Sequence, residues 1–216
     1  MNKNQLPDYG ATYIKRLISE GEHQQLDFKF EISDSKKIAK TFSAFANTYG
    51  GRLLVGVKDN GAIAGVRSEE EYYMIEAAAN MYCRPTIQFT VKKWLVETKN
   101  LLEISIQPSS EICYAKDNDG YWMAYTRVND QNIKVNKIWL EVRKRKAKPK
   151  GTFIEYSNNE KALLTYLSEN LNITLSKFIR LVNITKRDAE KIFINLASLD
   201  IIEIGFSEKG AFYSLK

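Results

Sequence analysis

The sequence predicts an α+β protein with one mixed-sheet domain and one smaller, mainly helical domain. Three observations lead to this fold class. Apolar side chains recur at helical spacing in some segments and alternate with polar ones in others. These segments are interleaved along the chain, and one dense run of cations separates two stretches of balanced charge. We therefore expect domains at residues 1–142 and 156–216, joined by a basic linker at 143–155.

The first domain begins with an amphipathic pattern over residues 11–20, which predicts a helix. The stretch EHQQLDFKFE, residues 22–31, alternates apolar and polar side chains and predicts a strand. A second helix is expected at 35–48. It should end at Gly50 and Gly51, because glycine enters left-handed backbone conformations without a steric penalty.

An apolar run at 53–57 follows and is typical of a strand buried on both faces. Asn60-Gly61 suits a tight turn, so we expect a return segment at 62–66 with Asp59 at the mouth of the hairpin. The remaining patterns predict strands near 87–91, 101–106 and 121–128 and a last helix with Val135, Ile138, Trp139 and Val142 on one side.

The second domain has three helical segments and two strands. Ser157 and Glu160 form an S-x-x-E capping box, a short helix fits 175–182, and Thr185 caps a third helix. Residues 201–215 alternate around a Ser-Glu-Lys-Gly turn, which predicts a hairpin.

Three helices followed by a hairpin resemble a winged helix-turn-helix domain, in which the third helix enters the DNA major groove. The resemblance implies DNA contacts from the third helix and the hairpin tip, at Lys186, Arg187, Lys191, Asn195 and Lys209. Alternatively, these are ordinary solvated side chains of a domain that contacts only protein.

The net charge of +6 lies in RKRKAKPK, residues 143–150. Residues 1–142 hold eighteen cations and eighteen acids, and residues 151–216 hold eight of each. Six phosphate contacts would give a log–log salt dependence of about −5, at roughly −0.9 per contact. The run is expected either to grip nucleic acid, through Arg143, Lys144, Arg145 and Lys146, or to act only as a solvated tether.

No apolar run approaches the ~18 residues of a membrane helix, and the N-terminus has no apolar signal-peptide core. A soluble cytoplasmic protein without a membrane partner is expected. Cys83 and Cys113 accompany a single histidine, a pattern that favours buried, reduced thiols over a zinc site or a disulfide.

Three segments of the first domain, EHQQLDFKF, FSAFANTYGGRLLVGVKDNGAIAGV and YTRVND, resemble the AlbA-like nucleic-acid-binding domain of the Schlafen family. The resemblance covers residues 20–133. Bacterial members often carry a C-terminal winged helix and are described as transcriptional regulators. It therefore implies a regulator that binds nucleic acid, with DNA favoured and RNA also possible as the partner, and that forms a homodimer if two half-sites are read.

Nuclease members of that family use three carboxylates, and matching by position gives Glu22, Asp27 and Asp59. Such a set would hold Mg²⁺ or Mn²⁺, which prefer hard oxygen ligands, and the ion would activate water against a phosphodiester. Lys29 would contact the phosphate. The alternative function is thus a metal-dependent endonuclease acting on RNA or DNA, although Asp59 before Asn-Gly also has the simpler use of a turn residue.

Some family members are described as ATP-binding. This sequence has no G-x-x-x-x-G-K-[ST] loop, and Gly50-Gly51 precedes a strand instead of a helix, so ATP is not expected. Binding of nucleic acid should need no cofactor. The sequence is also compatible with a protein-interaction adaptor, or with a sensor of nucleotides or small ligands.

One strand face carries Tyr121, Met123, Tyr125 and Arg127. Aromatic rings beside a guanidinium suit single-stranded nucleic acid, on which they would stack. A different interpretation is that this face packs beneath a helix.

Overall fold

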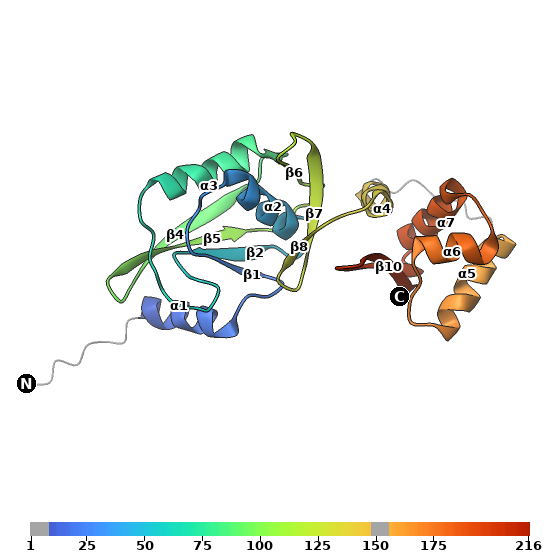
Figure 1. Ribbon diagram of the computed structural model, residues 1–216, viewed down its shortest axis with the longest axis horizontal. Helices are drawn as coiled ribbons and strands as arrows, with labels where there is room; N and C mark the ends of the chain where they lie inside the picture. Colours follow the sequence, from blue (N-terminus) through green and yellow to red (C-terminus); the bar gives the residue numbers. More distant parts are fainter. Residues whose placement is uncertain (1–8, 148–155) are drawn as a thin grey trace, which may run out of the picture. The chain divides into compact units, whose positions relative to one another are not determined.

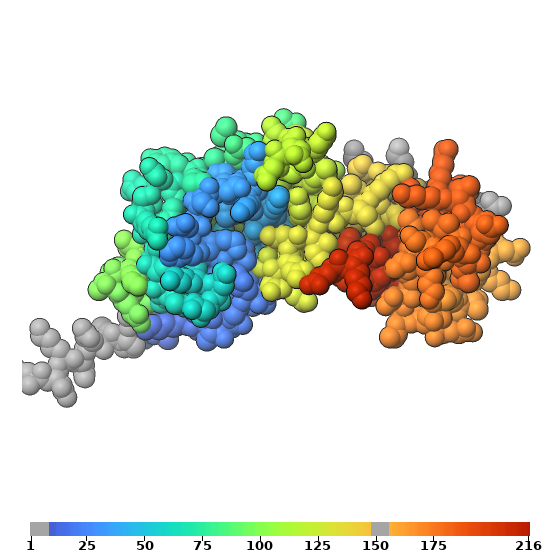
Figure 2. Space-filling view, in the orientation of Figure 1, coloured from blue at the N-terminus to red at the C-terminus, as the bar shows by residue number. Residues whose placement is uncertain are grey.

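The computed structural model describes residues 9–147 and 156–216. The chain divides into two compact units, residues 1–134 (unit 1) and 135–216 (unit 2). Each unit is a closely packed body (Figure 2). The division falls before the helix that was expected to close the first domain.

Unit 1 contains three helices and two sheets among its described residues. Along the chain the elements are α1 (Tyr9–Glu20), β1 (Leu26–Lys29), α2 (Ser35–Ala46), β2 (Gly51–Val55), α3 (Glu70–Met81), β3 (Cys83–Arg84), β4 (Phe89–Val96), β5 (Lys99–Ile106), β6 (Tyr114–Lys116), β7 (Trp122–Val128) and β8 (Gln131–Lys134). The main sheet has the order β1-β2-β5-β4, and the small sheet has the order β3-β6-β7-β8.

The main sheet is mixed, because β1 and β2 run parallel while β2, β5 and β4 pair antiparallel. Its two faces are covered by different helices (Figure 1). Leu54 packs with α1 on one face, whereas Leu53 and Val55 pack with α2 and α3 on the other. The sequence expectation of a strand buried on both faces is therefore confirmed for β2.

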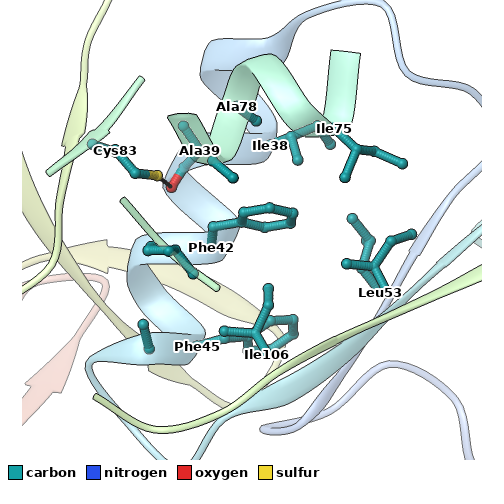
Figure 3. Packing of buried hydrophobic residues seen from close by; sticks show 14 of the residues in the cluster. Ile38, Ala39, Phe42, Phe45, Leu53, Ile75, Ala78, Cys83 and Ile106 are labelled. Atoms are coloured by element: carbon teal, nitrogen blue, oxygen red, sulfur yellow. Dashed lines mark hydrogen bonds between the residues drawn. The ribbon is translucent and has the colours of Figure 1, made fainter. Parts of the chain in front are cut away.

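Helix α2 lies between the main sheet and the small sheet. Asp34 caps it by accepting hydrogen bonds from the N–H groups of Lys36 and Lys37. Phe42 and Phe45 pack with residues of the main sheet (Figure 3). Beside them, the Cys83 thiol lies 3.7 Å from a backbone oxygen of α2. Both cysteines are buried free thiols, as expected.

The segment AFANTYGG joins α2 to β2 and is tied to the small sheet by Asn47. The buried Asn47 amide donates to the carbonyl oxygens of Cys113 and Tyr125, both at 2.8 Å, and accepts from the Cys113 N–H at 2.9 Å. Gly50 has φ +73°, and a Cβ there would lie 2.6 Å from the Ile106 oxygen. In this segment, α2, the small sheet and strand β5 of the main sheet therefore come into close contact.

Several elements of unit 1 were not predicted. Helix α3 begins without a side-chain cap, and its buried positions are an acid, an isoleucine and two alanines, so no strong apolar stripe marks it. Strands β3, β6 and β8 have two to four residues, which is too short for a period of two to be recognised. The strand expected near 87–91 is β4 and begins at Phe89.

Unit 2 contains four helices and a two-stranded hairpin among its described residues. The elements are α4 (Lys137–Ala147), α5 (Asn158–Glu169), α6 (Leu175–Val182), α7 (Lys186–Ser198), β9 (Ile202–Ser207) and β10 (Gly210–Leu215). The predicted capping box at Ser157 and Glu160 is present, and Thr185 caps α7. The C-terminal helices and the hairpin thus follow the sequence expectation.

Helix α4 belongs to unit 2 because its apolar residues enter that core. Ile138 and Val142 are buried together with Leu163 and Phe193. The first residues of the expected linker, 143–147, are helical and continue this helix. The rest of the expected linker, 148–155, lies outside the described residues.

None of the helices within the described ranges has the length and apolar character needed to span a bilayer.

Candidate functional site

The acid expected at the centre of a metal site, Asp27, is buried in unit 1 and already holds two cations. Only 3% of its surface is exposed. One carboxylate oxygen accepts a hydrogen bond from the Arg127 guanidinium at 3.2 Å, and the other lies 3.1 Å from Lys29 Nζ. Asp27 and Lys29 do share a strand face, as the alternation predicts, but the carboxylate is fully engaged.

Arg127 comes from β7 and ties that strand to β1. Its guanidinium also donates to Asn132 Oδ1 at 2.9 Å and to the Leu26 carbonyl at 3.3 Å, and it lies 5.1 Å from the Phe45 ring centroid. The side chain is 1% exposed, so it offers no surface to a nucleic acid. The expectation of a nucleic-acid contact at Arg127 is corrected by this burial.

The same correction applies to most of the aromatic face expected beside Arg127. Tyr125 is buried, and Met123 packs against the core that includes α2. Only Tyr121 is freely exposed. Packing beneath a helix was the second interpretation of this face, and it describes Tyr125 correctly.

Glu22 lies beside Asp27 and accepts a hydrogen bond from the Phe28 N–H at 2.7 Å. Burial raises the pKa of Glu22, and a hydrogen bond with Asp27 raises this pKa further. The Phe28 N–H and Lys29 act in the opposite direction. The structure thus brings together two of the three expected carboxylates.

The third carboxylate, Asp59, is exposed in the turn after β2, where the Gly61 N–H bonds the Lys58 oxygen at 2.8 Å. Within residues 9–147 and 156–216, no three His, Cys, Asp or Glu side chains gather as metal ligands would. Mg²⁺ or Mn²⁺ would also have to compete with the two cations on Asp27. The donor set therefore does not fit the expected metal.

Lys29, the expected phosphate contact in unit 1, is half-exposed. Its ammonium bonds the Phe28 carbonyl at 2.7 Å in addition to pairing with Asp27. The charge of Lys29 is consequently directed into the protein.

In unit 2, helix α7 has one side in the core and one side in solvent. Ala189 and Phe193 are fully buried. Arg187 and Lys191 are exposed, with Asn195 half-buried one further turn along the same side. Lys186, at the first position of the helix, is exposed as well. The opposite placement of these two sets is what the sequence predicts.

The basic end of α4 reaches this same side of α7. Arg145 Nη1 donates to Asn195 Oδ1 at 2.8 Å. We call Arg145, Arg187, Lys191 and Asn195 the basic face. The pairing of Arg145 with Asn195 was not predicted, because fifty residues separate them and no local pattern connects them.

The remaining cations of α4 are engaged within unit 2. Lys146 and Lys216 both pair with Asp200, at 2.8 and 2.6 Å, and they lower the Asp200 pKa to about 2. Lys144 pairs with Glu141 at 2.9 Å. Arg143 lies 5.7 Å from the Trp139 ring centroid. Lys144 and Lys146 thus pair with acids of unit 2, while Arg145 bonds Asn195, and contact of these four cations with nucleic acid stays a prediction.

The charge of the chain is divided unequally between the units. Residues 135–216 carry fifteen Lys and Arg against nine Asp and Glu, so the whole surplus of +6 lies in unit 2. Lys209 is exposed in the turn between β9 and β10. A net positive unit attracts polyanions over distances of about a Debye length.

Comparison with solved structures gives distant similarities. The DIP2311 protein of Corynebacterium diphtheriae is 18% identical at a TM-score of 0.46, and the match covers 88% of this chain. This chain spans about a third, 34%, of that protein. The N-terminal domain of a RecG-related protein from Nitrosomonas europaea is 15% identical at a TM-score of 0.35, with 68% of this chain and 96% of that domain covered.

The search of curated proteins found no match. The sequence profile of the family described as Schlafen, AlbA_2 matches residues 22–136, which is more than half of the chain and nearly all of the described part of unit 1. This match contains Asp27, Asn47 and the segment AFANTYGG. The chain therefore belongs to the Schlafen AlbA_2 family.

Proposed function

We propose that the protein is a DNA-binding transcriptional regulator that contacts duplex DNA through the basic face of unit 2. The observation that carries this proposal is the hydrogen bond between Arg145 and Asn195. It joins the end of a basic helix to the solvent side of α7, so cations from two helices are available to one polyanion.

The arrangement of unit 2 supports a winged helix-turn-helix as the form of this domain. Helices α6 and α7 are separated by three residues, of which Asn183 has a left-handed conformation at φ +53°. Ile173 forms an isolated bridge with Tyr213 of the terminal hairpin. In that architecture α7 would enter the major groove, with Lys186 and Arg187 nearest the base edges and Lys209 on the hairpin tip near the backbone.

The family supports a nucleic-acid partner in general terms. The Schlafen AlbA_2 domain is commonly associated with nucleic-acid binding. DNA is favoured over RNA in our proposal because the exposed helix is suited to the wide major groove of B-form DNA, whereas the major groove of RNA is deep and narrow. Reading two half-sites would further require a homodimer.

Fluorescence anisotropy of labelled duplex DNA over a salt series tests the proposal. The double variant Arg187→Ala/Lys191→Ala should lower affinity at least tenfold and reduce the log–log salt slope by about 2, near one per lost phosphate contact. Lys92→Ala/Lys93→Ala removes two exposed cations from β4 and is the matched control. Equal losses in the two double variants would show that α7 is not the reader.

The endonuclease alternative receives no support from the carboxylates of unit 1, because Asp27 is engaged by cations and Asp59 stands apart. It has its own assay. Transfer RNA and single-stranded DNA would be incubated with Mn²⁺ and either the wild-type protein or Asp59→Ala. Cleavage that the variant abolishes would restore this alternative.

A further inference from the structure

The small sheet of unit 1 has a face, opposite α2, on which aromatic and cationic side chains gather. Lys116 is paired directly with Trp122, and Tyr114 is paired with Arg84. Directly paired residues project from the same face of a sheet, and so do residues two apart on one strand. Arg84, Tyr114, Lys116 and Trp122 consequently share one face, which we call the outer face.

The residues between them point the other way and form the core. Cys83 and Ala115 are buried, and Met123 packs against the same cluster, which includes α2. On the outer face Arg84 is exposed, while Tyr114, Lys116 and Trp122 are half-buried. The strand alternation that placed Tyr125 in the core thus leaves Trp122 toward solvent.

The two cations of the outer face are directed at the tryptophan. The Arg84 guanidinium lies 4.3 Å from a Trp122 ring centroid, and Lys116 Nζ lies 5.9 Å from one, both within the range of cation–π attraction. Neither cation forms a salt bridge with a carboxylate in the parts of the chain that the structure describes. Their charges remain available to an anion.

The outer face is also hollowed. Arg84, Tyr114 and Trp122, with Pro85 and Ile112, line an open depression of about 360 Å³. Ligand sites have volumes of about 300–1,000 Å³ and combine apolar walls with a few polar groups. This depression is therefore large enough for one unstacked base with its sugar.

We propose that the outer face is a second nucleic-acid site of the protein, which binds single-stranded DNA or RNA. A base would stack on Trp122 or Tyr114, and Arg84 and Lys116 would contact the adjoining phosphates. Stacking needs a base whose ring face is free, which single strands offer and duplexes do not. The site is separate from the basic face of unit 2, and the proposal does not depend on duplex binding there.

The test uses the full chain in the Arg187→Ala/Lys191→Ala background, so that the basic face contributes little. Labelled dT12 and U12 are titrated by anisotropy. Trp122→Ala and Arg84→Ala/Lys116→Ala should each weaken binding about tenfold or more. Tyr121→Ala is the aromatic control, because Tyr121 adjoins Trp122 and is 65% exposed but projects from the opposite side of the strand. Affinities for dT12 and U12 distinguish DNA from RNA.

A second measurement covers the case in which Trp122→Ala fails to fold. The chain has three tryptophans, and a stacked base quenches indole fluorescence. Saturating dT12 should quench the wild-type emission, and Trp122→Phe, which keeps an aromatic ring, should retain binding but lose most of that quenching. Unchanged affinity in Arg84→Ala/Lys116→Ala, or quenching that persists in Trp122→Phe, would overturn the proposal. If the wild-type protein bound dT12 or U12 but not duplex DNA, this proposal would stand, and only the proposed role of α7 would be contradicted.

Discussion

Arg127 of unit 1 and Arg145 of unit 2 each donate a hydrogen bond to an asparagine side chain, at 2.9 and 2.8 Å. Arg127 is buried against Asp27 and several backbone groups, whereas Arg145 is exposed and has no carboxylate partner in the described parts of the chain. Residue type and hydrogen-bond partner are the same, and burial differs. A buried arginine contributes to folding, while an exposed one can exchange counterions for phosphates.

The largest expected effect is on stability, because replacing Arg127 should destabilise the protein far more than replacing Arg145. Arg127→Met should lower the free energy of unfolding of unit 1 by about 3–5 kcal/mol, because Asp27 would remain buried with half of its charge compensation lost. Arg145→Met is the matched control, and it should change the free energy of unfolding of unit 1 by less than about 0.5 kcal/mol. Urea unfolding in a Trp139→Phe background follows unit 1 through Trp94 and Trp122. Equal stabilities of the two variants would contradict the structural role of Arg127.

One asparagine of each unit provides a second contrast. Asn47→Ala should destabilise unit 1 by about 2–3 kcal/mol, since it removes the hydrogen bonds that the buried Cys113 N–H and the Tyr125 carbonyl form with the Asn47 side chain. Asn195→Ala on the solvent side of α7 should cost less than about 0.5 kcal/mol. Hydrogen exchange of the Cys113 amide measures the first effect locally. Unchanged protection there would mean that Asn47 does not join α2 to the small sheet.

The charged residues of the two units should differ in their effect on DNA binding. Arg145→Ala should reduce the log–log salt slope by about 0.9 and weaken duplex affinity at low salt. Lys29→Ala should leave both quantities unchanged, because the Lys29 charge is paired with Asp27. Anisotropy of labelled duplex DNA over a salt series measures both. A salt slope lowered by Lys29→Ala would place unit 1 in the duplex interface.

The smallest expected effects concern the pH dependence of stability, in which Glu22 of unit 1 and Asp200 of unit 2 act in opposite directions. The Glu22 pKa is raised, so its contribution to stability is present below about pH 4.3 and is lost as the pH rises through the raised pKa. The Asp200 pKa is lowered to about 2, so its contribution is present above about pH 3.9 and is lost as the pH falls toward 2.

Urea unfolding from pH 2 to pH 7 measures both pH effects against the variants Glu22→Gln and Asp200→Asn. Relative to Glu22→Gln, the wild type should lose stability on going from acid to neutral pH. Relative to Asp200→Asn, it should lose stability on acidification. Parallel pH profiles for wild type and either variant would contradict the assigned direction of that pKa shift.

Local patterns in the sequence were enough to predict the elements that local chemistry determines. The capping box at Ser157, the cap at Thr185 and the shared face of Asp27 and Lys29 each depend on residues within three positions of one another. The fold class followed from these elements. The solvent side of α7, with Arg187 and Lys191, could be predicted for the same reason.

Pairings between distant segments could not be predicted in this way. Arg127 meets Asp27 across a hundred residues, and no pattern near either one indicates the other. Helix α4 shows the same limit. Its apolar residues Ile138 and Val142 indicate that one side of the helix is buried, but they do not indicate whether that side packs in unit 1 or in unit 2. The family resemblance suggested three converging carboxylates, but the position of Asp59 depends on how a turn leaves the sheet.

Helix α4 also determines where the polypeptide can be cut. A fragment that starts at Tyr156 would lack Ile138 and Val142, leaving an apolar gap beside Phe193, and it should aggregate or fold poorly. A fragment that starts at Val135 would keep the complete interior together with Arg145. Only two residues, Val135 and Asn136, lie between β8 and α4, so a cut on either side of this pair would separate the elements of unit 1 from those of unit 2.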